Sequence, residues 1–220
     1  IALNGSIGAA ESYMAGKWSV SDLTLVVRIF AANPEVLNSV DRGTTRLASW
    51  IFKVAHRLRR NSRDQSRKNI QAHYDLGDDL FELFLDPTMS YSSAIYPGQE
   101  SSLAEAALHK LDLVCQRLDL RPADHLLEIG TGWGALAAHA ARNYGCRVTT
   151  TTISDNQFDV AVKRIQDEGL EDRVTVLKQD YRDLDGQYDK LVSIEMIEAV
   201  GHEYMDTYLK VCSERLKPHG

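Results

Sequence analysis

The residues best suited to chemistry in this chain lie in one short segment, EIGTGWG at residues 128–134. An apolar run at residues 126–129 precedes the glycines, and apolar residues at helical spacing follow between residues 135 and 144. This pattern predicts a strand, a tight turn and a helix. Glycines let the turn adopt positive φ angles and approach a ligand closely, and the first amides of the helix then face that ligand. We therefore expect a nucleoside-bearing cofactor there.

The glycine spacing alone fits more than one cofactor. Gly130, Gly132 and Ala135 satisfy the dinucleotide pattern GxGxxG/A, but that interpretation requires an acid about 20 residues later, at the tip of the next strand. The sequence there is TTTTIS, and the first acid is Asp155. A phosphate-binding P-loop is excluded because Gly-Lys-Ser/Thr does not follow. The pattern ExGxGxG, which begins at Glu128, is typical of doubly wound S-adenosylmethionine-dependent methyltransferases; the alternative is an ordinary turn without a ligand.

Strands and helices alternate around this turn. We expect strands at residues 126–129, 146–153, 174–178 and 188–195, with helices at 135–144, 155–168 and 203–216 and a long helix at 101–118 before the first strand. Such alternation predicts an α/β, doubly wound Rossmann-like sheet of the class I methyltransferase type. Residues 217–220 resemble the approach to another strand, so we expect the sheet to be truncated after its fourth strand and helix.

The strand tips supply further candidate ligands, because such a sheet binds its ligand over the carboxyl ends of the strands. Glu128 is expected to meet the amino-acid end or ribose of the cofactor. Thr152 and Gln157 can hold the ribose hydroxyls, and Asp180 can accept a hydrogen bond from an adenine amino group, with Tyr181 beside it. Capping of a helix or turn is an equally weighted alternative for Asp180.

Composition indicates a soluble globular protein. Of 220 residues, 44% are hydrophobic and 25% are charged, and no run of 18 apolar residues occurs. The three widely spaced cysteines predict reduced thiols of a cytosolic protein, with neither a disulfide framework nor a metal site.

Charge and helix patterns divide the chain into three parts. Residues 1–58 predict an N-terminal helical domain, with one helix that starts near Ser21 or Asp22 and ends at Asn33-Pro34, and a second helix at 45–58. Residues 59–70 are expected to be a basic linker, and residues 71–220 a C-terminally incomplete methyltransferase domain. Between Lys53 and Lys68 there are seven basic residues and one acid, whereas the whole chain has a net charge of −6. This segment is either a solvated basic helix or a contact for anionic lipid headgroups; a pI near 5.6 argues against nucleic acid.

Together these motifs resemble the cyclopropane-fatty-acid synthase family, which includes the mycolic acid cyclopropane synthases. The similarity is carried by GSIGAAESYMAGKW at residues 5–18, HYDLGDDLFELFLDPTMSYSSAIY at 73–96, LDLVCQRL at 111–118, EIGTGWG at 128–134, TISDNQ at 152–157, QDYRDL at 179–184 and SIEMIEAVG at 193–201. The second and the last of these are more specific than the glycine turn.

The resemblance implies a cytoplasmic enzyme that acts as a peripheral protein at the inner membrane surface. Its substrate would be the cis double bond of an unsaturated acyl chain in a membrane phospholipid. The alkene would take the methyl group of S-adenosyl-L-methionine, and the resulting carbocation would lose a proton to a bound bicarbonate ion and form a cyclopropane. Tyr74, Tyr91 and Tyr96 could shield a cation with their ring faces. A homodimer is one assembly that we consider, because the sequence does not specify the oligomeric state.

Matching positions to the family motifs assigns the site residue by residue. The resemblance implies cofactor contacts from Tyr91, Ser92, Glu128, Gly130, Gly132, Gly134, Thr152, Ser154, Gln157, Asp180 and Tyr181, and catalytic roles for Glu198, which would hold the bicarbonate, and Ser93. Two positions depart from the family pattern. Ser93 stands where cysteine is usual, and EMIEAVG at residues 195–201 stands where many members have GMFEHVG. The second variant resembles a branch that methylates or methylenates the acyl chain, so transfer without ring closure is one alternative; an inactive membrane-binding or dimerisation homologue is another.

Overall fold

The computed structural model describes residues 5–35 and 78–220. The chain divides into two compact units, residues 1–60 and 61–220. The basic linker predicted at residues 59–70, the helix predicted at 45–58 and the start of the predicted methyltransferase domain lie outside the described residues, so these boundaries stay predictions.

The described part of the first unit is helical. Helix α1 spans Gly5–Met14 and helix α2 spans Leu23–Ala32. The carboxylate of Asp22 accepts a hydrogen bond from the amide of Leu25 at 2.9 Å, which caps the start of α2, and the helix ends at Asn33. The predicted limits of this helix are therefore confirmed.

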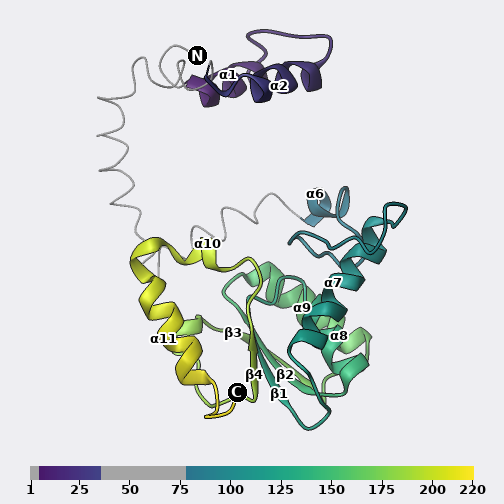
Figure 1. Ribbon diagram of the computed structural model, residues 1–220, viewed down its shortest axis with the longest axis vertical. Coiled ribbons are helices and arrows are strands. Elements are labelled where there is room, and N and C mark those ends of the chain that lie inside the picture. Colours follow the sequence, from purple (N-terminus) through teal and green to yellow (C-terminus); the bar gives the residue numbers. More distant parts are fainter. Residues whose placement is uncertain (1–4, 36–77) are drawn as a thin grey trace. The chain divides into compact units, whose positions relative to one another are not determined.

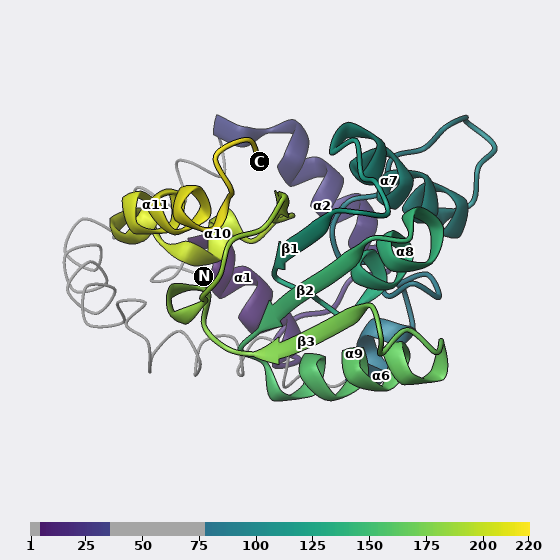
Figure 2. The ribbon, with the colours of Figure 1, turned by 90° about the horizontal axis from the view of Figure 1, so that it is seen from below.

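The second unit is built on a parallel sheet of four strands, β1 (His125–Ile129), β2 (Arg147–Thr152), β3 (Val174–Lys178) and β4 (Lys190–Val192), in the order β3-β2-β1-β4 (Figures 1 and 2). The chain leaves β1 toward β2 on one side and returns to β4 on the other. The strand order therefore changes direction between β1 and β4, which is the topological switch point of a doubly wound sheet. The predicted doubly wound, Rossmann-like sheet is confirmed.

Helices cover both faces of the sheet. Helices α7 (Leu103–Arg117), α8 (Ala135–Tyr144) and α9 (Asp155–Asp167) pack on one face, and α10 (Ile197–Val200) and α11 (Met205–Arg215) pack on the other (Figure 1). Successive residues of a strand point to opposite faces, so Leu126 enters the core beneath α7 and α8, whereas Leu127 and Ile129 enter the core beneath α11. Helix α6 (Asp78–Glu82) and the short turns η1 (Tyr181–Asp183) and η2 (His202–Tyr204) complete the described elements.

Strand β4 is shorter than predicted, because its neighbour β1 stops pairing with it. The backbone turns at Gly130, whose amide donates to the Thr151 carbonyl of β2 at 3.0 Å instead of extending β1. The hydroxyl of Ser193 then donates to the Ile129 carbonyl at 2.8 Å, where a longer strand would continue the ladder. The segment after Val192 is consequently released from the sheet and is available to form a site.

Two features of the described residues bear on the cysteine and membrane expectations. Cys115 and Cys146 are buried and Cys212 is half-buried, and all three are free thiols. Burial raises the pKa of Cys115 to about 12, so this thiol stays protonated. No described helix is long and apolar enough to cross a membrane.

Candidate functional site

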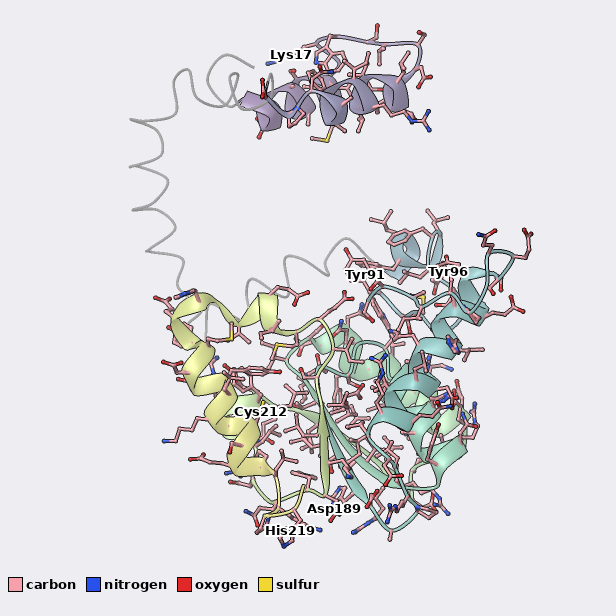
Figure 3. The ribbon with its side chains drawn as sticks, viewed as in Figure 1. Lys17, Tyr91, Tyr96, Asp189, Cys212 and His219 are labelled. Carbon is pink, nitrogen blue, oxygen red and sulfur yellow. The ribbon has the colours of Figure 1, made fainter. Side chains whose placement is uncertain are left out.

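A cavity of about 550 Å³ opens at the carboxyl ends of the strands, over the switch point between β1 and β4. Its size is within the usual range for small-molecule sites. It is lined by ten of the residues predicted from the sequence, namely Tyr91, Ser92, Glu128, Gly130, Gly132, Thr152, Gln157, Asp180, Tyr181 and Glu198. Figure 3 shows Tyr91 at the end of the unit opposite to Asp189 and His219.

The glycine turn forms the floor of this cavity. Gly130, Gly132 and Gly134 all have positive φ, at 97°, 53° and 86°. A Cβ at Gly134 would lie 3.2 Å from the backbone of Ala161 in α9, whereas a Cβ at Gly132 would meet nothing within 4 Å. Gly134 therefore permits close packing of α8 on α9, and Gly132 leaves open space on the ligand side.

Glu128 is the acidic residue beneath the turn, and it is only 4% exposed. The hydroxyl of Thr150 donates to its Oε2 at 2.5 Å. Burial raises the pKa of this carboxyl to about 7, although the Thr150 and Thr131 hydroxyls and the Lys110 ammonium act in the opposite direction. The buried Thr131 hydroxyl influences Glu128 in this way but has no hydrogen-bond partner of regular geometry among the described residues. This corner of the cavity can therefore accept a polar, positively charged ligand group.

The tip of β2 supplies a second polar corner. The hydroxyl of Thr152 donates to Oε1 of Gln157 at 3.0 Å, and both side chains are buried. Ser154 caps α9, because its hydroxyl accepts the amide of Gln157 at 3.3 Å. Thr152 and Gln157 face the cavity, whereas Ser154 is not among its lining residues.

The tip of β3 presents Asp180 already held by a cation. Arg182 donates to Asp180 through Nε at 2.8 Å and through a terminal nitrogen at 2.6 Å, and the Arg182 amide also donates to this carboxylate at 3.0 Å. Asp180 thus caps η1, as the alternative from sequence expected, and it also lines the cavity. The guanidinium of Arg182 lies 5.5 Å from the centre of the Tyr181 ring, so it orders both predicted adenine contacts.

The segment before α7 closes one side of the cavity. Lys110 of α7 is only 5% exposed and donates to the Ser92 hydroxyl at 2.6 Å. The Tyr91 and Phe81 rings are 5.2 Å apart, and Phe81 lies 5.1 Å from the buried Trp133 of the glycine turn. These contacts place the predicted residues Tyr91 and Ser92 against the cavity although they are distant in sequence from the strand tips.

The tip of β4 carries two carboxylates. Glu198, at the start of α10, lines the cavity and is exposed to solvent. Glu195 also lines the cavity, and its Oε1 accepts hydrogen bonds from the Ser93 amide at 2.9 Å and the Ser93 hydroxyl at 3.1 Å. Ser93 is therefore beside the cavity through Glu195 and is not itself among the lining residues.

Three predicted site residues do not line the cavity: Ser93, Gly134 and Ser154. Tyr96 is exposed and also lies outside the lining, and Tyr74 is outside the described residues. Lys110 and Glu195 also line the cavity, although no site role was predicted for either residue from the sequence. A signal existed for Lys110, because it follows Ala106 and Ala107 at helical spacing and precedes Leu111 on the buried side of α7.

The chain matches the family model for mycolic acid cyclopropane synthetase over residues 61–220. It is 39% identical to tuberculostearic acid methyltransferase of Mycobacterium tuberculosis, over 100% of this chain and 52% of that protein. It is 40% identical to cyclopropane-fatty-acyl-phospholipid synthase of Escherichia coli strain K12, over 98% of this chain and 54% of that protein. The chain therefore spans about half the length of these curated relatives.

The structure resembles that of mycolic acid cyclopropane synthase CmaA1 complexed with SAH and CTAB. The TM-score is 0.67 at 36% sequence identity, and the match covers 69% of this chain and 53% of that chain.

Proposed function

The chain belongs to the mycolic acid cyclopropane synthetase family, and we propose from this that the protein transfers the methyl or methylene group of S-adenosylmethionine to the cis double bond of an unsaturated acyl chain in a membrane phospholipid. The product that we propose is a cyclopropane fatty acid. One observation carries the proposal: the glycine turn, the tips of β2 and β3 and the Glu198 carboxylate converge on a single cavity at the switch point of the sheet.

The lining residues suit S-adenosylmethionine. Glu128 can take the charged amino-acid end, Thr152 and Gln157 can hold the ribose hydroxyls, and Asp180 with Tyr181 can bind the adenine edge. Gly130 and Gly132 allow the close approach that such a ligand needs. When bound, S-adenosylmethionine supplies an electrophilic methyl group on a sulfonium.

The protein's main task in this reaction is to align the alkene with the methyl group and to exclude water. An alkene is a weak nucleophile, so it must be held in line with the methyl group. Water would capture the carbocation that follows. Tyr91 and Trp133 of the cavity lining, with Phe81 packed against both, provide an apolar wall against it. The face of the Tyr91 ring can also stabilise positive charge.

A base must then remove one proton from the cation. The family resemblance assigns this role to bicarbonate held by Glu198. Ser93 stands where cysteine is usual, and the exchange is mild if that position binds the bicarbonate through its backbone amide. In that form of the mechanism, Glu198→Gln abolishes the product and leaves S-adenosylmethionine binding intact. The Glu195 carboxylate lies at the same place, and the resemblance assigns it no role.

The test is to incubate the full-length protein with S-adenosylmethionine labelled in its methyl group and with vesicles of dioleoyl phosphatidylglycerol. Mass spectrometry of the acyl chains should show incorporation of the labelled carbon. Cyclopropane and methylene products have equal masses and are separated by fragmentation, whereas a saturated methyl branch is heavier by two hydrogen atoms. Absence of label from the lipid, with bound S-adenosylmethionine detected by calorimetry, would contradict the proposal.

Methyl transfer without ring closure is the second candidate. It is supported by the 39% identity to a protein named tuberculostearic acid methyltransferase and by the EMIEAVG variant at residues 195–201. The fragmentation step above separates it from the first candidate. An inactive homologue is a third possibility from sequence, and it need not bind S-adenosylmethionine at all.

We also propose that the protein works in the cytoplasm as a peripheral protein at the inner membrane surface, where its phospholipid substrate lies. The basic residues between Lys53 and Lys68 support this part of the proposal through their charge. A homodimer remains a prediction, and light scattering of the purified protein measures it.

A further inference from the structure

One contact at the cavity is not explained by the family mechanism, and it joins residues 102 positions apart in sequence. The Glu195 carboxylate accepts hydrogen bonds from both the amide and the hydroxyl of Ser93. In the family mechanism, Ser93 would take part only if its backbone amide binds the bicarbonate. A carboxylate of the chain itself accepts the hydrogen bond of that amide here.

The backbone at Glu195 supports a functional role for this side chain. Its φ is 49°, in the left-handed region that favours glycine, and many family members have glycine at this position. Glutamate therefore occupies an unfavourable backbone conformation here. Strain of this kind in native structures is concentrated at functional sites.

Glu195 interacts electrostatically with Lys110, which also lines the cavity. Lys110 is the cation of the neighbouring wall, and Glu195 is the strongest of the carboxylates that raise the pKa of its ammonium, against the larger effect of burial, which lowers it. Lys110 also donates a hydrogen bond to Ser92, the residue next to Ser93. Lys110 therefore interacts with Glu195 through charge and with the segment that carries Ser93 through a hydrogen bond. Glu128 and Asp86 are the other acids that act on Lys110.

We propose that Glu195 is the proton acceptor of the reaction and takes the place that the family resemblance gives to bicarbonate. This inference rests on the proposed function. The alkene π electrons form a bond to the methyl carbon, and the C–S bond breaks with its electron pair left on sulfur. A C–H bond of the transferred methyl then breaks, its electron pair closes the three-membered ring, and the proton goes to a carboxylate oxygen of Glu195.

The chemistry requires a well-placed base and not a strong one. A carbocation is a far stronger acid than a carboxylic acid, so proton transfer from the cation to a carboxylate is strongly favourable. Position decides the outcome, because the base must reach the methyl group before water captures the cation. The two hydrogen bonds from Ser93 fix the carboxylate at the cavity wall for this purpose.

The experiment measures labelled product from S-adenosylmethionine and dioleoyl phosphatidylglycerol vesicles, in sealed buffer either depleted of bicarbonate or supplemented with sodium bicarbonate. The wild-type protein should turn over equally in both buffers. Glu195→Gln should lose about 100-fold or more in turnover, which is typical for removal of a general base, while its affinity for S-adenosylmethionine, measured by calorimetry, stays the same. Glu171→Gln, on the exposed loop before β3, is the matched control and should behave as wild type.

Glu195→Gly provides a second and more specific readout. It removes the carboxylate, suits the positive φ and leaves the Ser93 amide free for an added anion. We expect this variant to be inactive without bicarbonate and to regain turnover when bicarbonate or formate is added. A residue that only positions the Ser93 segment would not be rescued by a small anion.

Two results would overturn the inference in different ways. If wild-type turnover requires bicarbonate, Glu198→Gln abolishes it and Glu195→Gln does not, then bicarbonate is the acceptor and the proposed function stands without Glu195. If the wild-type protein transfers no label to lipid in either buffer, the proposed function fails and this inference fails with it.

Discussion

Individual side chains at this site are held in states that they would not adopt in water. Glu128 is buried with a pKa raised to about 7, and Lys110 is buried with a lowered pKa. Glu195 keeps a positive φ at a cost of about 1 to 3 kcal/mol. Each departure is unfavourable for folding, and all three residues line the same cavity. Such clustering is what a binding or catalytic site produces.

The raised pKa of Glu128 predicts how stability depends on pH. Because its pKa in the folded protein is above the ordinary value, the folded state binds the proton more tightly, so this residue's contribution is fully present below about pH 4.5 and is lost as the pH rises to about 7. We expect Glu128→Gln to remove this dependence. Urea unfolding without ligand at pH 5 and pH 8 should show that the wild type loses a few kcal/mol relative to the variant.

The opposite sign of the pH effect would show that Glu128 is ionised in the folded protein. Addition of S-adenosylmethionine provides the complementary control. A cationic ligand favours the charged carboxylate, so wild-type affinity should rise between pH 6 and pH 8, and the affinity of Glu128→Gln should change little.

At the scale of elements, two glycines of the strand–turn–helix unit have different roles. One allows two helices to pack closely, and the other allows a ligand to approach the backbone. Gly134 packs against α9, whereas Gly132 faces open space in the cavity. Both have positive φ, so an alanine at either position carries a similar backbone cost of about 1 to 2 kcal/mol. The two positions therefore form a matched pair of mutation sites.

Gly134→Ala should destabilise the protein more than Gly132→Ala, because its Cβ would be forced to within 3.2 Å of the Ala161 backbone. Thermal unfolding should show a difference of about 1 to 3 kcal/mol between the variants. Gly132→Ala should instead lose affinity for S-adenosylmethionine, measured by calorimetry. Equal stability and equal affinity in both variants would contradict this division of roles.

At the scale of the whole molecule, charge is distributed unevenly along the chain. The net charge is −6, yet seven basic residues and one acid lie between Lys53 and Lys68. An anionic membrane would attract that segment and repel most of the remainder. Each basic residue near such a surface contributes about 1 kcal/mol, so the segment could provide most of the membrane affinity.

Replacement of Arg57, Arg59, Arg60 and Arg63 by glutamine should weaken binding to phosphatidylglycerol vesicles by about a hundredfold or more, and added salt should weaken wild-type binding in the same way. Co-sedimentation measures this. Phosphatidylcholine vesicles serve as the uncharged control, and S-adenosylmethionine affinity should not change. Unaltered vesicle binding would favour the alternative, a basic segment that is merely solvated.

The amino-acid pattern was sufficient to predict the sheet, the glycine turn and most of the cavity lining. Runs of apolar and β-branched residues located all four strands, although β4 ends earlier than predicted, and helical spacing located the helices between them. The topology of such sheets brings their carboxyl ends together, so the order of the elements along the chain was enough to predict that Glu128, Thr152, Gln157 and Asp180 converge.

Tertiary packing determined which side chains surround the cavity residues. The early end of β4, the Arg182 that holds Asp180 and the burial of Lys110 all depend on contacts between segments that pattern analysis treats separately. The pairing of Glu195 with Ser93 spans 102 residues and depends on a positive φ that sequence spacing does not encode. Local periodicity specifies which face of an element is buried, but the partner across a site is fixed only when the whole chain is packed.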